Sequence, residues 1–312
     1  MSHSHAHGHS HGHGHSHGHG HDHHHHALPP GDWRYGFAIL LNLGFVVVEA
    51  VYGLIAGSTA LLADAGHNLS DVLGLALAGG AAWLARQAGS RRHTYGYGKA
   101  TILAALANAV VLVFACGAIA MEAAGRLFSP QPVAETTVMV VAGVGFLINL
   151  GTAMLFLRGR KEDLNVRGAY LHMIADAAIS LGVVVVGAVM LFTGWTLVDP
   201  LASIAIVIII LAGTWGLLRQ SFDMAMDSAP EHLDLDEVRA YLGGLPGVSA
   251  VHDMHVWNLS TTETALTVHL VRETAADSAF LAAIQSEVKR RFGIGHATVQ
   301  VETGPLADCP DC

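Results

Sequence analysis

The chain has 312 residues, of which 52% are hydrophobic and 13% are charged, and its mean hydropathy is +0.45. Soluble domains carry about 25% charged residues, so this composition argues against an ordinary soluble protein and predicts long apolar segments. The net charge of -9 comes from residues 221–312, where 14 acidic residues outnumber 5 basic ones, and this acidic balance argues against nucleic-acid binding.

The first 32 residues form a histidine-rich segment that is predicted to be a disordered cytosolic tail. Fourteen of residues 1–26 are His, and most of them alternate with Gly and Ser. Such a segment has too few apolar side chains to form a core. An expression tag is the alternative interpretation, but purification tags are usually uniform His runs. The mixed composition favours a flexible tail that collects metal ions.

Six apolar segments follow, and each is long enough to cross the roughly 30 Å hydrocarbon core of a bilayer. They span residues 36–56, 59–85, 101–121, 136–157, 168–192 and 197–218, with short connections between them. We therefore expect an α-helical membrane protein with a six-helix transmembrane domain over residues 33–220. Cys116 lies in the third segment, where an inert packing role is expected.

Basic residues are concentrated in the loops on one side of the predicted bundle. These two loops contain Arg86, Arg91, Arg92 and Lys99 after the second span, and Arg158, Arg160, Lys161 and Arg167 after the fourth. The loops on the opposite side contain only Arg126. The positive-inside rule therefore places both termini in the cytosol. The expected location is a plasma membrane, such as a bacterial inner membrane.

The composition becomes more polar after the sixth span, which predicts a cytosolic domain over residues 221–304. Residue periodicity predicts, in order, a helix at 234–243, strands at 248–259 and 265–272, a helix at 278–292 and a strand at 298–301. The order αββαβ is typical of a small ferredoxin-like α+β domain, in which helices cover one face of a sheet. Residues 305–312 are expected to form a C-terminal tail that carries a C-x-x-C pair.

Ionisable residues in two of the predicted spans require partners. Asp64, His67 and Asp71 share one face of the second span, and His172 and Asp176 share one face of the fifth. A carboxylate that faces lipid at the centre of a helix costs on the order of 2.5–3.5 kcal/mol, so three of them would cost roughly 8–10 kcal/mol. Neither predicted span contains Lys or Arg. A bound cation is therefore the simplest partner.

The types of ligand restrict which cation fits between these two spans. The unit H-x-x-x-D occurs twice, and two imidazoles with two carboxylates suit a tetrahedral Zn²⁺ site. The lack of soft ligands disfavours Cu(I), and the two His side chains disfavour Mg²⁺ and Mn²⁺. The alternative is a set of hydrogen-bonded core residues, against which the duplication argues.

Three further polar residues are candidates for a supporting role or a proton path. Asp64 lies one turn before His67, so it is a candidate helper in proton transfer or helix positioning. Asn42 and Glu49 are seven residues apart in the first span and share a face. Hydrogen bonding between helices is the alternative role for this pair.

These motifs resemble those of the cation diffusion facilitator family over nearly the whole chain. The resemblance rests on the pairs His67/Asp71 and His172/Asp176, together with YGYGK at 95–99, Asp199-Pro200, and HDMHVW at 252–257. It implies a homodimer of six-span subunits in the lipid bilayer, with a metallochaperone-like cytosolic domain. It also implies export of divalent cations by proton antiport.

The resemblance also bears on which metal is carried. Family members with His at the position of His67 are mostly zinc transporters, whereas Asp there tends to accompany Mn²⁺ or Fe²⁺. The chain differs from many eukaryotic members because residues 158–167, between the fourth and fifth spans, are short and basic rather than His-rich. The N-terminal tract is expected to do the work of that loop.

A first metal site is expected on the sheet of the cytosolic domain. His252 and His269 lie in adjacent predicted strands, and the resemblance supports them, together with Glu302, as zinc ligands. Strand parity predicts that His252 shares a face with Met254 and Val256. His255 is then expected to point the other way, which makes it a weaker candidate.

A second cytosolic metal site is expected near the C-terminus. Cys309 and Cys312 supply half of a tetrahedral site, which His296 or histidines of the tail could complete. In the cytosol a reduced, metal-binding pair is expected rather than a disulfide. Two free thiols on an unstructured terminus are the alternative.

The predicted function is proton-coupled antiport that exports Zn²⁺ from the cytosol by alternating access. Zinc ligands must lose protons to bind, so protons and metal compete for one site. The alternatives are Co²⁺, Ni²⁺ or Cd²⁺ as the main substrate, or a membrane metal sensor that does not transport. An enzyme is not expected, because a zinc hydrolase needs an open coordination position, whereas four protein ligands are present here.

Overall fold

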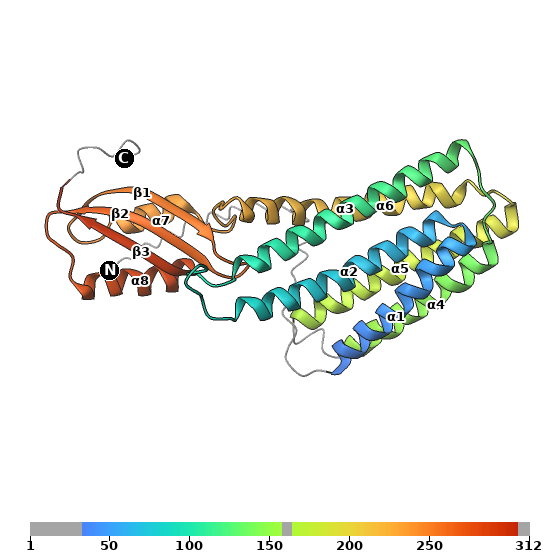
Figure 1. Ribbon diagram of the computed structural model, residues 1–312, viewed down its shortest axis with the longest axis horizontal. Coiled ribbons are helices and arrows are strands. Elements are labelled where there is room, and N and C mark those ends of the chain that lie inside the picture. Colours follow the sequence, from blue (N-terminus) through green and yellow to red (C-terminus); the bar gives the residue numbers. More distant parts are fainter. Residues whose placement is uncertain (1–32, 158–163, 305–312) are drawn as a thin grey trace, which may run out of the picture.

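The computed structural model describes residues 33–157 and 164–304. The His-rich segment and the terminal C-x-x-C pair lie outside these residues. Six long helices come first in the chain: α1 (Trp33–Ala56), α2 (Thr59–Ala85), α3 (Lys99–Phe128), α4 (Glu135–Phe156), α5 (Leu164–Thr193) and α6 (Val198–Ala225). They form one end of an elongated molecule, and a small sheet domain forms the other (Figure 1).

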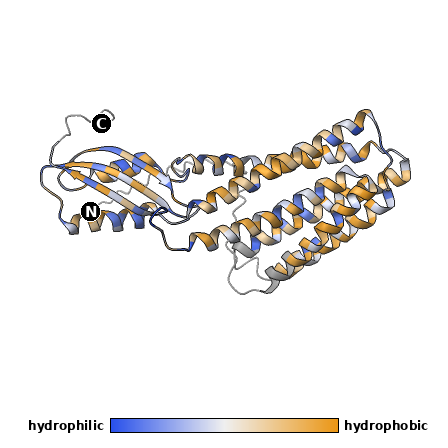
Figure 2. Cartoon of the chain, in the orientation of Figure 1, coloured by the Kyte–Doolittle hydropathy of each residue, from blue (hydrophilic) through white to orange (hydrophobic). Residues whose placement is uncertain are grey.

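The bundle has the apolar surface of a membrane domain. Helices α2 to α6 each contain a stretch long and apolar enough to cross a bilayer, and the described part of α1 contributes a shorter apolar stretch, Leu40–Ala56. Hydrophobic residues dominate the helices of the bundle, whereas the sheet domain is mixed (Figure 2), and many large apolar side chains of the bundle are exposed, among them Leu54, Ile55 and Phe114. The prediction of a helical membrane domain joined to a small α+β domain is confirmed.

The helices pack chiefly as neighbours in two pairs, α4 with α5 and α3 with α6, while α2 contacts α1, α3 and α6. Their buried apolar side chains form one core that includes Leu61, Val138, Val183 and Met190. Helices α3 and α6 extend beyond the apolar segments predicted for them, and α6 continues to Ala225. They run side by side toward the sheet domain (Figure 1).

The sheet domain contains the predicted elements in the predicted order: α7 (Leu235–Gly243), β1 (Val248–Asn258), β2 (Thr264–Arg272), α8 (Ser278–Phe292) and β3 (Ile294–Glu302). The strand order is β1-β2-β3, with β1 antiparallel and β3 parallel to β2. Helix α8 makes the crossover between the two parallel strands, as a parallel connection requires. The last strand is longer at both ends than predicted.

Local sequence signals set the limits of α8. Asp277 caps its N-terminus by accepting a hydrogen bond from the backbone N of Phe280 at 2.8 Å. Gly293 ends it in the left-handed conformation, at a φ of 72°. The helix buries Ile284 and Val288 against one face of the sheet, together with Leu266 and Leu270 of β2. The opposite face of the sheet is therefore left to polar side chains.

Polar contacts join the sheet domain to the bundle. Lys99 Nζ at the start of α3 lies 2.6 Å from Asp227 Oδ1, just after α6. The backbone N of Thr261, in the turn between β1 and β2, donates to Thr101 Oγ1 at 3.1 Å. The ring of Tyr95, in the loop before α3, meets the edge of His296 at a centroid distance of 5.4 Å. The segment 95–101 therefore holds the two regions together.

Candidate metal sites

The four intramembrane residues predicted to bind metal come together between α2 and α5. His67 Nε2 lies 3.7 Å from Asp71 Oδ2 and 3.4 Å from Asp176 Oδ1. His172 Nε2 lies 3.3 Å from Asp71 Oδ2 and 3.6 Å from Asp176 Oδ2. Each imidazole thus contacts both carboxylates, and we call these four residues the membrane quartet.

The spacing within the membrane quartet matches a tetrahedral zinc site. Zinc bonds to His nitrogen and carboxylate oxygen are about 2.0–2.2 Å long, which puts neighbouring ligand atoms of a tetrahedron roughly 3.3–3.6 Å apart. The four His–carboxylate separations are 3.3 to 3.7 Å. One ligand atom from each of His67, Asp71 and Asp176 lies within 4.8 Å of the other two. An ion between the two helices would contact His67, Asp71 and Asp176, and His172 lies beside them with its Nε2 3.3 Å from Asp71 Oδ2.

The membrane quartet is unequally exposed. The side chains of Asp71 and His172 are 30% and 35% exposed, whereas those of His67 and Asp176 are 15% and 3% exposed. Along α2 and α5, Asp71 and His172 lie one turn nearer to the end of the bundle that faces the sheet domain. The quartet is therefore more open toward that end.

The three supporting candidates occupy different places around the quartet. Glu49 and Asp64 are both fully buried, and each interacts electrostatically with the other. Asn68 donates to Glu49 Oε2 at 3.2 Å. Asn42 lies apart from them, with its Nδ2 3.7 Å from the sulfur of Met173. Glu49 and Asp64 are thus neighbours, and Asn42 contacts the residue next to His172.

Asp64 has a buried partner that its sequence pattern did not predict. Ser180 Oγ on α5 donates to Asp64 Oδ2 at 2.8 Å, and both residues are fully buried. The available signal was its spacing, because Ser180 lies four residues after Asp176 and so shares the helical face of the membrane quartet.

Asp199 has a structural role that its resemblance to a family motif did not reveal. This fully buried carboxylate, in the first turn of α6, accepts from the backbone N of Thr59 at 2.7 Å and from Thr59 Oγ1 at 2.8 Å. It also accepts from the Ser58 hydroxyl and from the backbone N of Ala60. Asp199 therefore ties α6 to the N-terminus of α2, the helix that carries His67 and Asp71.

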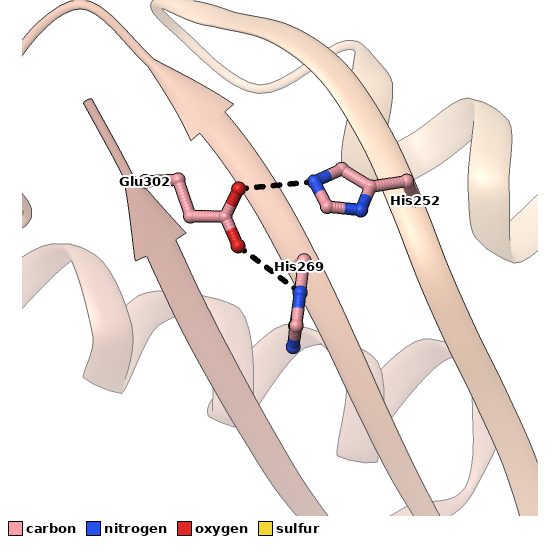
Figure 3. Close-up of side chains that lie close together, drawn as sticks. All are labelled: His252, His269 and Glu302. Atoms are coloured by element: carbon pink, nitrogen blue, oxygen red, sulfur yellow. Dashed lines mark hydrogen bonds and ion pairs between the residues drawn. The ribbon is translucent and has the colours of Figure 1, made fainter. Parts of the chain in front are cut away.

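The predicted cytosolic ligands also meet on the open face of the sheet. His252 pairs directly with His269 across β1 and β2, and Glu302 reaches both from β3 (Figure 3). Glu302 Oε2 lies 3.1 Å from His252 Nε2, and Glu302 Oε1 lies 3.1 Å from His269 Nδ1. One ligand atom from each of these three residues lies within 4.8 Å of the other two, and we call them the cytosolic trio.

The donor atoms of the cytosolic trio fit a zinc ion. His269 Nδ1 is buried and makes no hydrogen bond within the part of the chain that the structure describes, although it lies close to Glu302. A buried nitrogen without a hydrogen bond is suited to direct its lone pair at a cation. Two imidazoles and one carboxylate are also common zinc ligands.

The prediction that His255 points away from His252 is wrong. The register of β1 shifts between these two residues, because Asp253 forms a bulge with a left-handed φ of 47°. His252 pairs with His269 and His255 pairs with Thr267, so both face the open side of the sheet. Val256 pairs with Leu266 and joins the helix-covered core instead. A bulge breaks the two-residue period on which the prediction rested.

The second predicted cytosolic site has only one member among the described residues. His296 lies near the start of β3 and contacts Tyr95, about 20 Å along the strand from Glu302. Cys309 and Cys312 lie outside the described residues. The proposed grouping of these three residues stays a prediction.

Comparisons with known proteins identify the class to which this architecture belongs. Residues 37–225 match the model of the cation efflux transmembrane domain, and residues 230–304 match that of the cation efflux protein cytoplasmic domain. The chain therefore belongs to the cation efflux family, also called the cation diffusion facilitators. It is a multi-pass membrane protein of a metal-exporting family rather than a member of an enzyme class.

Named relatives cover the chain almost from end to end. The metal cation efflux system protein CzcD of Cupriavidus metallidurans is 36% identical over 89% of both chains. The zinc transporter ZitB of Escherichia coli is 37% identical over 89% of this chain and 90% of its own. The cadmium, cobalt and zinc/H(+)-K(+) antiporter of Bacillus subtilis is 34% identical over 85% of this chain and 87% of its own. These similarities support metal cation efflux.

A solved structure of a related domain also matches part of the chain. It is the metal-bound C-terminal domain of the CzcD transporter, which is 36% identical and covers 22% of this chain and 99% of its own, with a TM-score of 0.21.

Proposed function

We propose that the protein exports Zn²⁺ from the cytosol in exchange for protons, with the membrane quartet as the transport site. The observation that carries this proposal is the set of four His–carboxylate separations of 3.3 to 3.7 Å inside the bundle. They suit a tetrahedral ion with two nitrogen and two oxygen ligands. A relative named as a zinc transporter supports the same choice of metal.

Proton coupling follows from the chemistry of the membrane quartet. Imidazole nitrogen and carboxylate oxygen bind Zn²⁺ only when they are deprotonated, so each proton that returns to a ligand weakens metal binding. His67 and His172 are the side chains that titrate nearest to neutral pH in unperturbed form. In the proposed cycle, zinc displaces protons on the cytosolic side and protons displace zinc on the other side.

The exposure of the membrane quartet supports a conformation open to the cytosol. The more exposed members, Asp71 and His172, lie toward the end that faces the sheet domain. The basic loops after the second and fourth spans support a cytosolic location for that end and for both termini. A zinc ion arriving from the cytosol would meet Asp71 and His172 before His67 and Asp176.

We assign Glu49 and Asp64 to a proton path beside the transport site. Two neighbouring carboxyls in a buried position favour holding a proton between them, because two uncompensated negative charges there are costly. Asn68 donates a hydrogen bond to Glu49, and Ser180 donates one to Asp64. Asn42, whose Nδ2 lies 3.7 Å from the sulfur of Met173 on α5, has a supporting role beside the quartet.

The cytosolic domain is proposed to hold zinc on His252, His269 and Glu302 and to join two subunits. Residues 221–312 carry a net charge of -9, so two copies repel each other. Zinc bound near the contact would offset that repulsion and favour closer approach. Distances between spin labels on the two cytosolic domains should shorten when zinc is added, and unchanged distances would contradict this part of the proposal.

The decisive experiment is transport into proteoliposomes with an imposed pH gradient. The wild-type protein should move Zn²⁺ and protons in opposite directions, and Asp71→Asn should abolish both fluxes. Glu122→Gln is the matched control, because Glu122 is an exposed acid of α3 that pairs with Arg126 away from the membrane quartet. Zinc-driven proton flux retained by Asp71→Asn would refute the assignment of the site.

Cadmium and cobalt are the second candidate substrates, because one relative is named for transport of both together with zinc. The same proteoliposomes, supplied in turn with Zn²⁺, Cd²⁺, Co²⁺, Ni²⁺ and Mn²⁺, separate these possibilities. Zinc should give the largest initial rate. No metal flux with any of the five ions would instead favour a membrane metal sensor.

A further inference from the structure

The bulge in β1 places a strained acidic residue beside the cytosolic trio. Among the described residues, Asp253 and Asp227 are the only ones other than glycine with a positive φ. Asp tolerates this left-handed conformation better than most residues, but it is still unfavourable for a residue with a side chain. Strain of this kind persists where the surrounding structure or the function of a site requires it.

The carboxylate of Asp253 lies between two imidazoles. Its Oδ1 is 2.8 Å from His255 Nε2, and its Oδ2 is 3.4 Å from His269 Nε2. The contact with His255, and then the other two nearby histidines, hold the pKa of Asp253 below its usual range. Asp253 is therefore an acceptor that faces one nitrogen of His269, while Glu302 faces the other.

This arrangement bears on which nitrogen of His269 can bind a metal. A neutral imidazole has one N–H and one lone pair, and a carboxylate close to one nitrogen favours the proton at that nitrogen. Side chains that orient metal-binding histidines in this way commonly contribute 10–100-fold to metal affinity. His269 Nδ1 lies 3.1 Å from Glu302 Oε1 and Nε2 lies 3.4 Å from Asp253 Oδ2, so a zinc ion bound between Nδ1 and Glu302 would leave Nε2, which faces Asp253, as the protonated nitrogen.

We propose that Asp253 is the positioning residue of the cytosolic trio. It holds the proton of His269 on Nε2, so that Nδ1 presents its lone pair to zinc between His252 and Glu302. His255, in turn, holds Asp253 in place. This inference rests on the zinc role proposed above for the cytosolic trio, and it adds to that role a residue that binds no metal itself.

The test is equilibrium zinc binding to the full-length protein in detergent. The zinc that binds to the wild-type protein but not to His269→Ala is the ion that depends on the cytosolic trio. Asp253→Gly removes the carboxylate, and glycine suits the left-handed backbone at this position. This variant should lower the affinity for that ion about 10–100-fold without abolishing its binding. Asp253→Asn keeps an acceptor oxygen and should have a smaller effect. Glu287→Gln removes the same charge from α8, where Glu287 pairs with Arg290, and should have no effect.

A second measurement separates positioning from general damage to the domain. In protein with ¹⁵N-labelled histidine rings, the spectrum of His269→Ala subtracted from that of wild type isolates His269. With zinc bound, wild type should show a metal-bound Nδ1 and a protonated Nε2, and Asp253→Gly should show a mixture of both ligation modes.

Three outcomes would overturn the inference. Wild-type affinity and pure Nδ1 ligation in Asp253→Gly would show that Asp253 positions nothing. Loss of a whole separate ion in Asp253→Gly, with the His269-dependent ion unchanged, would make Asp253 a direct ligand of another metal. If His269→Ala loses no zinc, the proposed cytosolic site itself fails, and the inference fails with it.

Discussion

The membrane quartet and the cytosolic trio use the same kinds of ligand on different supports. In the membrane, the ligands are two pairs spaced four residues apart, one pair on α2 and one on α5. In the cytosolic domain, they lie on three strands of one hydrogen-bonded sheet. The chemistry is therefore shared, while the mechanical setting differs.

This difference bears on how readily each site can release its ion. Helix α5 packs mainly along α4, whereas α2 packs mainly against α3 and α1. The two ligand pairs of the quartet therefore lie on helices that pack against different neighbours. A small movement between α2 and α5 would separate two ligands from the other two. The trio lies on hydrogen-bonded strands of one sheet, so movement between membrane helices would not by itself separate its ligands. The quartet suits an ion that is passed on, and the trio suits an ion that stays.

The largest expected effect is on zinc transport, when one ligand is removed from the quartet and, for comparison, one from the trio. Asp176→Ala removes the most deeply buried carboxylate of the quartet. It should lower zinc transport by more than about 100-fold, beyond the effect typical of residues that only orient a ligand. His252→Ala should leave transport within about tenfold of wild type. Initial rates of zinc uptake in proteoliposomes measure both, and equal losses would contradict the division of roles.

The next effect concerns the structural carboxylate that anchors α2. Asp199→Ala removes the acceptor for the Ser58 hydroxyl and for backbone N–H groups at the start of α2. The free energy of unfolding should fall by roughly 2–4 kcal/mol, since several buried donors at the start of α2 lose a charged partner. Unfolding of the purified protein in detergent measures this. Asp223→Ala, which removes an exposed acid of α6, is the control and should change little.

A smaller effect is expected when the trio loses its charge. Glu302→Gln keeps the shape of the side chain but weakens both contacts with His252 and His269. Affinity for the ion that depends on His269 should fall about 10–100-fold, because a carboxylate is a far better zinc ligand than an amide. Equilibrium zinc binding checks this. Full zinc affinity in the variant would show that Glu302 is not a ligand.

The smallest effect should appear as a change in metal preference at the quartet. His67→Asp replaces one nitrogen ligand with oxygen, and harder oxygen ligands suit Mn²⁺ better than imidazole does. The ratio of zinc to manganese transport should fall about tenfold, which corresponds to about 1.4 kcal/mol between the two ions. Competition between the two metals in the same vesicles measures this ratio. An unchanged ratio would mean that ligand type does not set the preference.

The pattern of apolar residues along the chain predicted most of the fold, because helices and strands depend mainly on residues that are close in sequence. Six apolar runs predicted six membrane helices, and the α8 segment was predicted from its first residue to its last. Its cap at Asp277 and its stop at Gly293 are local signals that need no tertiary contact. The bulge at Asp253 was not predictable in this way, because the pairing of β1 with β2 decides it. The expected orientation of His255 failed for that reason.

The sequence by itself determined which side chains are costly in a membrane, since His67, Asp71, His172 and Asp176 lie in apolar segments whatever the packing. Only the tertiary structure decided that these residues face one another at distances that suit a single ion. It alone also revealed the contacts of Asp199 with the start of α2 and of Asp253 with His269. The physical reason is that burial cost belongs to each residue, whereas a contact depends on how distant segments pack.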